Sequence, residues 1–389
     1  MRVKNVTVHQ VHIPLRKRIK HASHVRTDTE NLVVCVRLEN GTAGYGEGVP
    51  REYVTGETIE ASMSLLREME REPFRRDYNT FEEAVNAAQS LTLPPVPGDD
   101  RMCQGNGARC ALELAFLDAF GKHFQRPLSD VTKILEPDLF EPKRHVQYSG
   151  VITSARGHKA RIAAMIMWCY CFRQLKVKVG MAGFDDPQRL RTIRRRVGRK
   201  MDIRIDANEA WSPAEAAECL RALEPFDISS IEQPLSHADV EKLPWLREQI
   251  RMPIMLDESL CSEIDANRAA DGKLCDLFNL RLSKCGGFTR TLRIASIAKQ
   301  RGLGCQLGCQ VGETAILSAA GRHFACSVSG LRYLEGSYDS RLVMEALGKK
   351  NITFGWGGWA PALTGGGLGI EIDEVALQRV TSHTEQLLV

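Results

Sequence analysis

The sequence lacks any long apolar run, and this absence limits where the protein can work. Its longest apolar stretch, residues 162–172, is too short to cross a bilayer. Residues 1–6 also lack the apolar core of a secretion signal. We therefore expect a cytoplasmic protein that has no membrane partner.

Strong charge of one sign is missing as well. The formal net charge is +4 over 389 residues, which is too small to indicate a polyanionic partner. The most basic segment, residues 189–200, carries Leu190, Ile193 and Val197 at helical spacing, so its basic side chains fit a solvated helix face. We expect no nucleic-acid partner.

Paired cysteine spacing is the third absence. Among the twelve cysteines, the closest neighbours are Cys169 with Cys171 and Cys305 with Cys309, and no histidine cluster accompanies them. This spacing suits neither a zinc site nor a disulfide framework. We expect free, mostly buried thiols in a reducing compartment.

What the chain does have is a series of charged residues at nearly constant spacing. Five segments carry them: Lys176-Val177-Lys178, Asp206-Ala207-Asn208, Glu232-Gln233-Pro234, Asp257-Glu258-Ser259 and Lys284-Cys285-Gly286-Gly287. The steps are 28 (178 to 206), 26 (206 to 232), 25 (232 to 257) and 27 residues (257 to 284). Most segments follow a short apolar run, and a strand, a helix and two loops need roughly that length. The spacing predicts an α/β fold, a (β/α)7–8 barrel of the TIM type whose strand ends meet at one mouth.

Three carboxylates at one mouth would repel one another unless a cation lay between them. They are Asp206, Glu232 and Asp257. Their oxygens suit Mg2+, with Mn2+ as the alternative, and leave positions open for a substrate carboxylate. Lys178 and Lys284 come from opposite sides of this trio, which indicates removal of the proton next to that substrate carboxylate. The metal and Lys176 would lower the pKa of a lysine base from its ordinary value near ~10.4.

The five segments in this order resemble the enolase superfamily, within it the muconate-lactonizing-enzyme subgroup, whose sites pair a lysine or histidine base with magnesium. The resemblance covers nearly the whole chain. Residues 108–121 resemble the last long helix of the family's capping domain, and Gly44-Tyr45-Gly46-Glu47 the end of its N-terminal hairpin. It implies that the three carboxylates bind the metal, that Lys178 and Lys284 are the acid/base lysines, and that Lys176 is auxiliary.

The order of expected elements divides the chain into three parts. We expect an α+β capping domain over 1–142, a barrel with catalytic residues at its strand ends over 143–340, and a C-terminal segment, 341–389. By resemblance, that segment returns to complete the capping domain. The barrel should begin with a strand near 145–149.

The capping domain should open with strands and continue with helices. We expect strands at 3–14 and 31–38, and helices near 57–70, 79–91 and 108–124. By resemblance, the polar loop 17–29 and the segment 49–56 are lids that read the distal end of the substrate, whereas ordinary exposed loops are the alternative.

The last two barrel strands leave several polar residues without a settled role. Gln310 and Glu313 follow the expected seventh strand. Glu313 would hydrogen-bond a substrate oxygen or a lysine in the site, or else stand in the first turn of a helix at 314–325. Glu335 and Asp339 follow the expected eighth strand, and their roles stay open.

We interpret the protein as an Mg2+-dependent enzyme that forms an enediolate from a small carboxylic acid, giving cycloisomerisation of the muconate type, racemisation or epimerisation, or β-elimination. The alternatives are an L-Ala-D/L-Glu type dipeptide epimerase, an N-acyl amino acid racemase and an o-succinylbenzoate synthase-like enzyme. Dipeptide epimerases of the subgroup commonly carry Asp-x-Asp at the eighth strand, where this chain has Glu335-Gly336-Ser337. A silent barrel that only binds small molecules and a Schiff-base lyase are the other hypotheses. By resemblance we expect a homo-oligomer, a dimer or an octamer.

Overall fold

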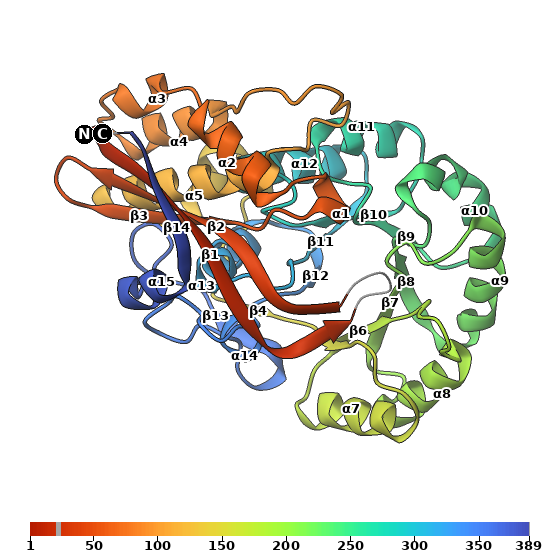
Figure 1. Ribbon diagram of the computed structural model, residues 1–389. Helices are drawn as coiled ribbons and strands as arrows, with labels where there is room; N and C mark the ends of the chain where they lie inside the picture. The colour runs from red at the N-terminus through yellow and green to blue at the C-terminus, as the bar shows by residue number, and fades with distance from the viewer. Residues whose placement is uncertain (21–24, 389) are drawn as a thin grey trace.

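The N-terminal part forms a cap built on an antiparallel sheet. A computed structural model describes residues 1–20 and 25–388. The sheet order is β14-β1-β2-β3, with β1 (Val3–Lys20), β2 (Val25–Leu38), β3 (Ala43–Gly48) and, from the other end of the chain, β14 (Thr381–Leu388). The C-terminal segment therefore returns to the cap, as expected, and Figure 1 shows both termini at this sheet.

The hairpin arms of β1 and β2 are longer than the sequence predicts. The expected loop 17–29 is wrong over 17–20 and 25–29, where pairs such as Ile19 with Arg26 continue the ladder. Polar side chains on an exposed pair of strands do not interrupt backbone hydrogen bonds, so polarity there indicated solvent and not a loop. Residues 21–24 of that loop lie outside the described residues.

Helices cover one face of the cap sheet. They are α1 (Glu52–Thr55), α2 (Ile59–Arg67), α3 (Glu72–Arg75), α4 (Phe81–Ser90) and α5 (Asn106–His123), followed by α6 (Asp130–Leu135). Every residue of α5 from Asn106 to Gly121 is buried, so this helix is the centre of the cap. It packs directly on β3, where a Cβ at Gly46 would lie only 2.0 Å from the carbonyl oxygen of Ala111. Alternate glycines on β3 therefore allow the sheet to touch the helix backbone.

Eight parallel strands form the barrel. In chain order they are β5 (Gly150–Ile152), β6 (Gln174–Lys178), β7 (Asp202–Asp206), β8 (Ile228–Glu232), β9 (Ile254–Leu256), β10 (Leu277–Leu280), β11 (Gly304–Leu307) and β12 (Leu331–Leu334). They pair in sequence order, and Ser149 N donates to Leu334 O (2.8 Å) across the gap between the two edge strands. The expected first strand near 145–149 is wrong as a barrel strand. Residues 145–147 form β4 (His145–Gln147), which pairs with β13 (Trp359–Pro361) of the C-terminal segment. Alternation predicted a strand there, but it carries no information about the strand's partner.

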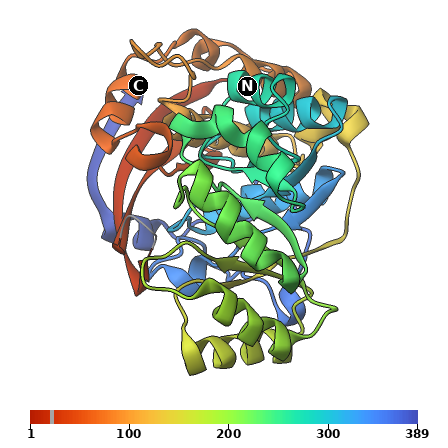
Figure 2. The same ribbon diagram turned by 90° about the vertical axis from the view of Figure 1, so that its right-hand side faces the viewer.

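Helices surround the barrel, as the crossover of parallel strands requires. They are α7 (Gly157–Cys169), α8 (Asp186–Val197), α9 (Pro213–Leu223), α10 (Leu243–Gln249), α11 (Glu263–Asp271), α12 (Phe288–Gln300) and α13 (Ala315–Ser327). Figure 2 shows the green helices of this set in front of the strands. Across the described residues, no helix combines the length and apolarity that a membrane crossing needs.

Two buried carboxylates attach the cap to barrel helices. Glu47 of β3 accepts hydrogen bonds from the backbone N–H groups of Thr314 (3.0 Å) and Leu317 (3.1 Å) at the start of α13. Glu113 of α5 accepts in the same way from Thr289 N (3.3 Å) at the start of α12. Each carboxylate satisfies helix donors that have no partner within their own helix. The cap thus supplies the N-terminal caps of two barrel helices.

Candidate active site

The two lysines of β6 point to the same side of the barrel wall. Lys176 and Lys178 are two residues apart, so they share the inward face, and both are buried. Lys176 Nζ lies 2.7 Å from Glu232, 3.1 Å from Asp206 and 3.2 Å from Glu335. Lys178 Nζ donates to Asn208 Oδ1 at 2.8 Å.

The three predicted carboxylates come together at neighbouring strand ends. Strand register places Lys178 beside Asp206 and Asp206 beside Glu232, and Asp257 follows the end of β9. All three carboxylates are at most 1% exposed. Strand register thus brings Asp206 next to Glu232, whereas the joint role of the three carboxylates as metal ligands stays a prediction.

Lys284 reaches the same carboxylates from the other side. It lies in a turn after β10, and its Nζ donates to Asp257 O (2.6 Å), Asp257 Oδ1 (2.9 Å) and Asn279 O (2.9 Å). The glycines that follow it are required by packing against the cap, because a Cβ at Gly287 would lie 2.3 Å from Glu113 Oε2. Asn106 of α5 also binds the Lys284 carbonyl (2.7 Å). The cap therefore fixes the position of this lysine.

The electrostatic surroundings shift the pKa values of the three lysines in different directions. Burial lowers the pKa of Lys178, and nearby Lys176 adds to this effect although Asp206 opposes it. Burial also opposes the charge of Lys284, but Asp257 outweighs it and the pKa of Lys284 is raised. The same competition, with Asp206 as the largest opposing charge, places the pKa of Lys176 well above its ordinary value. Lys178 is thus suited to act as a base, and Lys284 to hold a proton.

Two arginines that the motifs did not single out belong to the site. Arg281 forms ion pairs with Asp257 and, at 3.9 Å, with Glu232. Arg204 is fully buried, binds Glu335 Oε1 (2.5 Å) and lies over the Tyr333 ring (4.6 Å to the centroid). A signal for Arg204 was present, because it stands two residues before Asp206 and so shares its inward face.

The amide residues of the motifs hold the loops in place. Gln233 accepts from Asp257 N (2.9 Å) and donates to Ser259 Oγ (2.8 Å), so it joins the loops after β8 and β9. Asn208 accepts from Lys178 and donates through Nδ2 to Glu258 Oε1 (3.2 Å). These bonds explain why an amide follows each of the first two carboxylates.

The remaining polar candidates have mixed outcomes. Glu313 precedes α13 and is not in its first turn; its Oε1 accepts from Gln310 N (2.6 Å), and burial raises its pKa to about 8. Its contact with substrate or lysine stays a prediction. Glu335 belongs to the site through Lys176 and Arg204. Asp339 is buried at the start of α14 (Asp339–Leu342).

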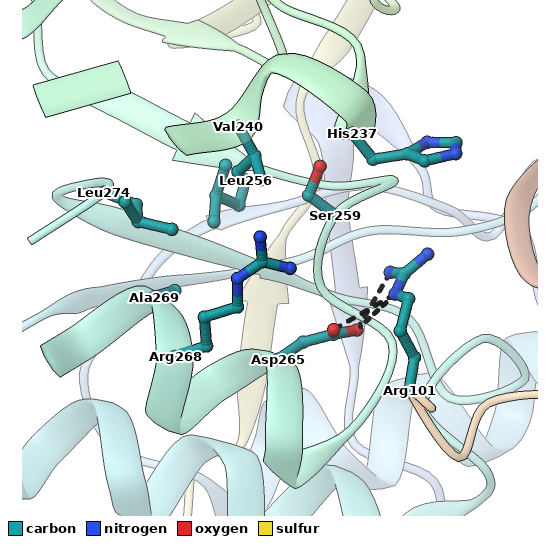
Figure 3. Close-up of a pocket in the computed structure, with 9 residues that line it drawn as sticks. All are labelled: Arg101, His237, Val240, Leu256, Ser259, Asp265, Arg268, Ala269 and Leu274. Carbon is teal, nitrogen blue, oxygen red and sulfur yellow. Dashed lines mark hydrogen bonds and ion pairs between the residues drawn. The ribbon is translucent and has the colours of Figure 1, made fainter. Parts of the chain in front are cut away.

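The pocket drawn in Figure 3 lies beside this site and is separate from it. It has a volume of about 40 Å³, room for about three waters, and is lined by residues such as Arg101 and Asp265. The dashed lines mark the ion pair between these two side chains (2.9 Å), which joins the cap to α11. A pocket of this size does not hold a substrate.

The carboxylates suit a hard divalent cation in their chemistry. Among the described residues, no group of three acidic, histidine or cysteine side chains is arranged to hold a metal ion. Lys176 and Arg281 form ion pairs with Glu232 and Asp257. Lys176 also contacts Asp206, and Arg281 also contacts Glu232, so these two cations neutralise charge on all three carboxylates. Glu258 Oε2 is a further buried oxygen without a hydrogen-bond partner in the described part of the chain. An all-oxygen donor set of this kind fits Mg2+.

A comparison with known families identifies the fold and its relatives. The profile described as "Enolase C-terminal domain-like" matches residues 159–376, more than half of the chain. The chain belongs to this family. It is therefore an enolase-superfamily enzyme, as the resemblance of its five segments implied, and the curated relatives below are epimerases and racemases.

Several relatives span nearly the same length. The N-succinyl-L-Arg/Lys racemase of Bacillus cereus is 28% identical over 386 residues, 98% of each chain, and its crystal structure superposes with a TM-score of 0.85 at 26% identity, covering 99% of this chain and 100% of that one. The hydrophobic dipeptide epimerase of Enterococcus faecalis is 27% identical over 330 residues, 84% of this chain and 88% of its own. The dipeptide epimerase of Cytophaga hutchinsonii, crystallised with Mg and D-Ala-L-Val, has a TM-score of 0.84 at 25% identity and full coverage of both chains.

Proposed function

We propose that the protein is an Mg2+-dependent racemase or epimerase that removes and returns the proton alpha to a substrate carboxylate. The observation that carries this proposal is the pair of buried lysines on opposite sides of the carboxylate trio, with pKa values shifted in opposite directions. One lysine is prepared to accept a proton and the other to donate one. Asp206, Glu232 and Asp257 are the proposed metal ligands.

The residues of the chain divide the reaction between them. Lys178, in its neutral form, takes the α-proton, and the electron pair of the broken C–H bond moves onto the substrate carboxylate. When bound, Mg2+ would supply positive charge for that carboxylate. Lys284 donates its proton to the opposite face of the α-carbon. Lys176 stays charged among the acids and adds positive charge to the site.

We propose N-acylated amino acids as the substrate class. An N-acyl group carries no ammonium, and the acid at the end of β12 is not free to bind one: Glu335 is already paired with Arg204 (2.5 Å) and Lys176 (3.2 Å). The racemase relative that acts on N-succinyl amino acids also matches nearly the full length of the chain. Dipeptides are the second candidate, because dipeptide epimerases are among the relatives.

The test is proton exchange in D2O. The protein is incubated with Mg2+ and N-succinyl amino acids, N-acetyl amino acids, dipeptides and muconates, and α-deuterium is followed by NMR. We expect exchange with inversion on N-acyl amino acids, and its loss with a chelator. Exchange only on dipeptides would refute the substrate class. The absence of exchange on every acid would leave a binding protein, and trapping with borohydride would reveal a Schiff-base lyase.

We further propose a homo-oligomer, a dimer or an octamer, that works in the cytoplasm. Light scattering on the purified protein checks the first proposal, since a monomer would exclude it. Fractionation of cells that produce the untagged protein checks the second.

A further inference from the structure

Two cysteines from different parts of the chain meet where the cap closes on the barrel. Cys103 lies just before α5, and Cys261 lies four residues after the proposed metal ligand Asp257. They are 3% and 0% exposed. With Val54 they form a small apolar cluster separate from the main core.

Both thiols also contact the short helix α1. Cys103 Sγ lies 3.8 Å from Thr55 O, and Cys261 Sγ lies 3.9 Å from Val54 O. The two sulfurs therefore contact consecutive carbonyl groups of α1. This turn belongs to the segment 49–56 that we expect to act as a lid.

Charged groups of both signs lie near Cys261: Lys284 and Arg101 favour its thiolate, and Asp265 opposes it. Arg101 donates to Glu258 O (2.9 Å) beside it and pairs with Asp265, which in turn accepts from Cys261 N (2.8 Å). Burial opposes ionisation of Cys261, but the neighbouring Cys103 thiol and the charge of Lys284 outweigh it, so the pKa of Cys261 is lowered.

The other buried thiols show the usual behaviour. Burial raises the pKa of Cys305 to about 12, and it raises that of Cys110 as well. Low thiol pKa beside positive groups is the environment of reactive cysteines, whereas apolar burial keeps a thiol inert.

We propose that Cys103 and Cys261 are a redox site at which a reversible disulfide joins the cap to the barrel. The proposal stands on the contact of two buried thiols in one small cluster, from segments 158 positions apart (103 to 261). A small peroxide is the oxidant that suits this buried position.

The chemistry takes place in two steps. The Cys261 thiolate attacks one oxygen of the peroxide, the O–O bond breaks, and Cys261 becomes a sulfenic acid while hydroxide leaves. The sulfur of Cys103 then attacks the sulfur of Cys261, and water leaves with the Cys103 proton. In total, two thiols and one H2O2 give one disulfide and two waters.

Oxidation would change the lid segment as well. A disulfide has no S–H group, so the carbonyls of Val54 and Thr55 would lose their thiol neighbours while the cap becomes covalently tied to the loop after β9. The effect on substrate binding rests on the proposed function, whereas disulfide formation does not.

The experiment uses the full chain with Cys169→Ser and Cys171→Ser, because these two cysteines are exposed and would react first. The protein is treated with one equivalent of H2O2, alkylated after denaturation and mapped by mass spectrometry. Ten of the twelve cysteines remain in this variant. After oxidation we expect eight alkylated thiols and one cross-linked peptide pair that contains Cys103 and Cys261. Dithiothreitol should restore both thiols.

A matched variant keeps the test decisive. With Cys103→Ser added, no cross-link should form, and dimedone should trap a sulfenic acid at Cys261. Cys275→Ser, at another buried cysteine, should leave the cross-link unchanged. A cross-link between other cysteines would overturn the proposal. Ten free thiols would overturn it too, if the same treatment oxidises Cys169 and Cys171 in the unsubstituted chain. Neither result depends on activity, so failure here is distinct from failure of the proposed function.

Discussion

Replacing Lys178 by arginine separates its charge from its ability to accept a proton. Arginine keeps a cation beside Asn208 and Asp206 but stays protonated at any working pH. General base catalysis contributes about 10²–10⁴-fold, so we expect α-proton removal by Lys178 to slow by that factor, equivalent to about 3–5 kcal/mol of barrier. Lys284→Arg should impair the opposite face of the α-carbon.

The assay compares the two enantiomers of one substrate in D2O. The wild type should exchange and invert both, whereas Lys178→Arg should lose inversion and exchange of the enantiomer whose proton faces residue 178. The wild-type rate should rise with pH as Lys178, whose pKa is lowered, becomes neutral, and should fall at higher pH when Lys284, whose pKa is raised, loses its proton. Full inversion by Lys178→Arg with an unchanged pH profile would refute this assignment.

Three further predictions concern stability and positioning. Gly46→Ala places a methyl group 2.0 Å from a backbone oxygen of α5, so we expect a loss of about 1–3 kcal/mol by urea unfolding. The control Gly321→Ala lies on helix α13, where the new Cβ would make an ordinary contact with Leu307 Cδ2 (3.9 Å), so it should be neutral or stabilising. Burial lowers the pKa of His323 to about 4, so the stability that its neutral ring contributes is present above pH 6.5 and is lost as the pH falls toward 4. Between pH 7.5 and 5, the free energy of unfolding of His323→Gln should therefore fall by about 2 kcal/mol less than that of the wild type. An equal fall in both proteins would contradict the reasoning. Gln233→Ala should weaken Mg2+ binding, measured by calorimetry, about 10–100-fold because Asp257 loses its anchor, and unchanged affinity would exclude that role.

The sequence predicted those site residues that recur once in each strand-and-helix unit of the barrel. The steps from Lys178 to Lys284 follow the length of a strand, a helix and two loops, so the strand ends that carry the carboxylates could be predicted without a structure. The cap helix near 108–124 was also predictable, because a long run of helix formers and apolar residues marks α5.

The parts that could not be predicted depend on which neighbour a residue meets. Arg281 carries the same charge in the sequence whether it faces solvent or a carboxylate, and only the folded sheet places it beside Asp257. Strand β4 has the alternation of a barrel strand but pairs with the C-terminal segment, a contact more than 200 positions away. Patterns with a short period do not encode such partners.

The cap supplies side chains that complete helices of the barrel, and this limits where substitutions can change the substrate range. Glu47 and Glu113 leave the cap to complete α13 and α12, and Asn106 holds the backbone of Lys284. Divergence along α5 would therefore displace a reacting group. Substitutions at the start of the segment 49–56 carry a similar risk, because Val49 N donates to Ser283 Oγ (2.8 Å), directly before Lys284. Libraries that seek new substrates in this scaffold should therefore begin at the ends of strands β1 and β2.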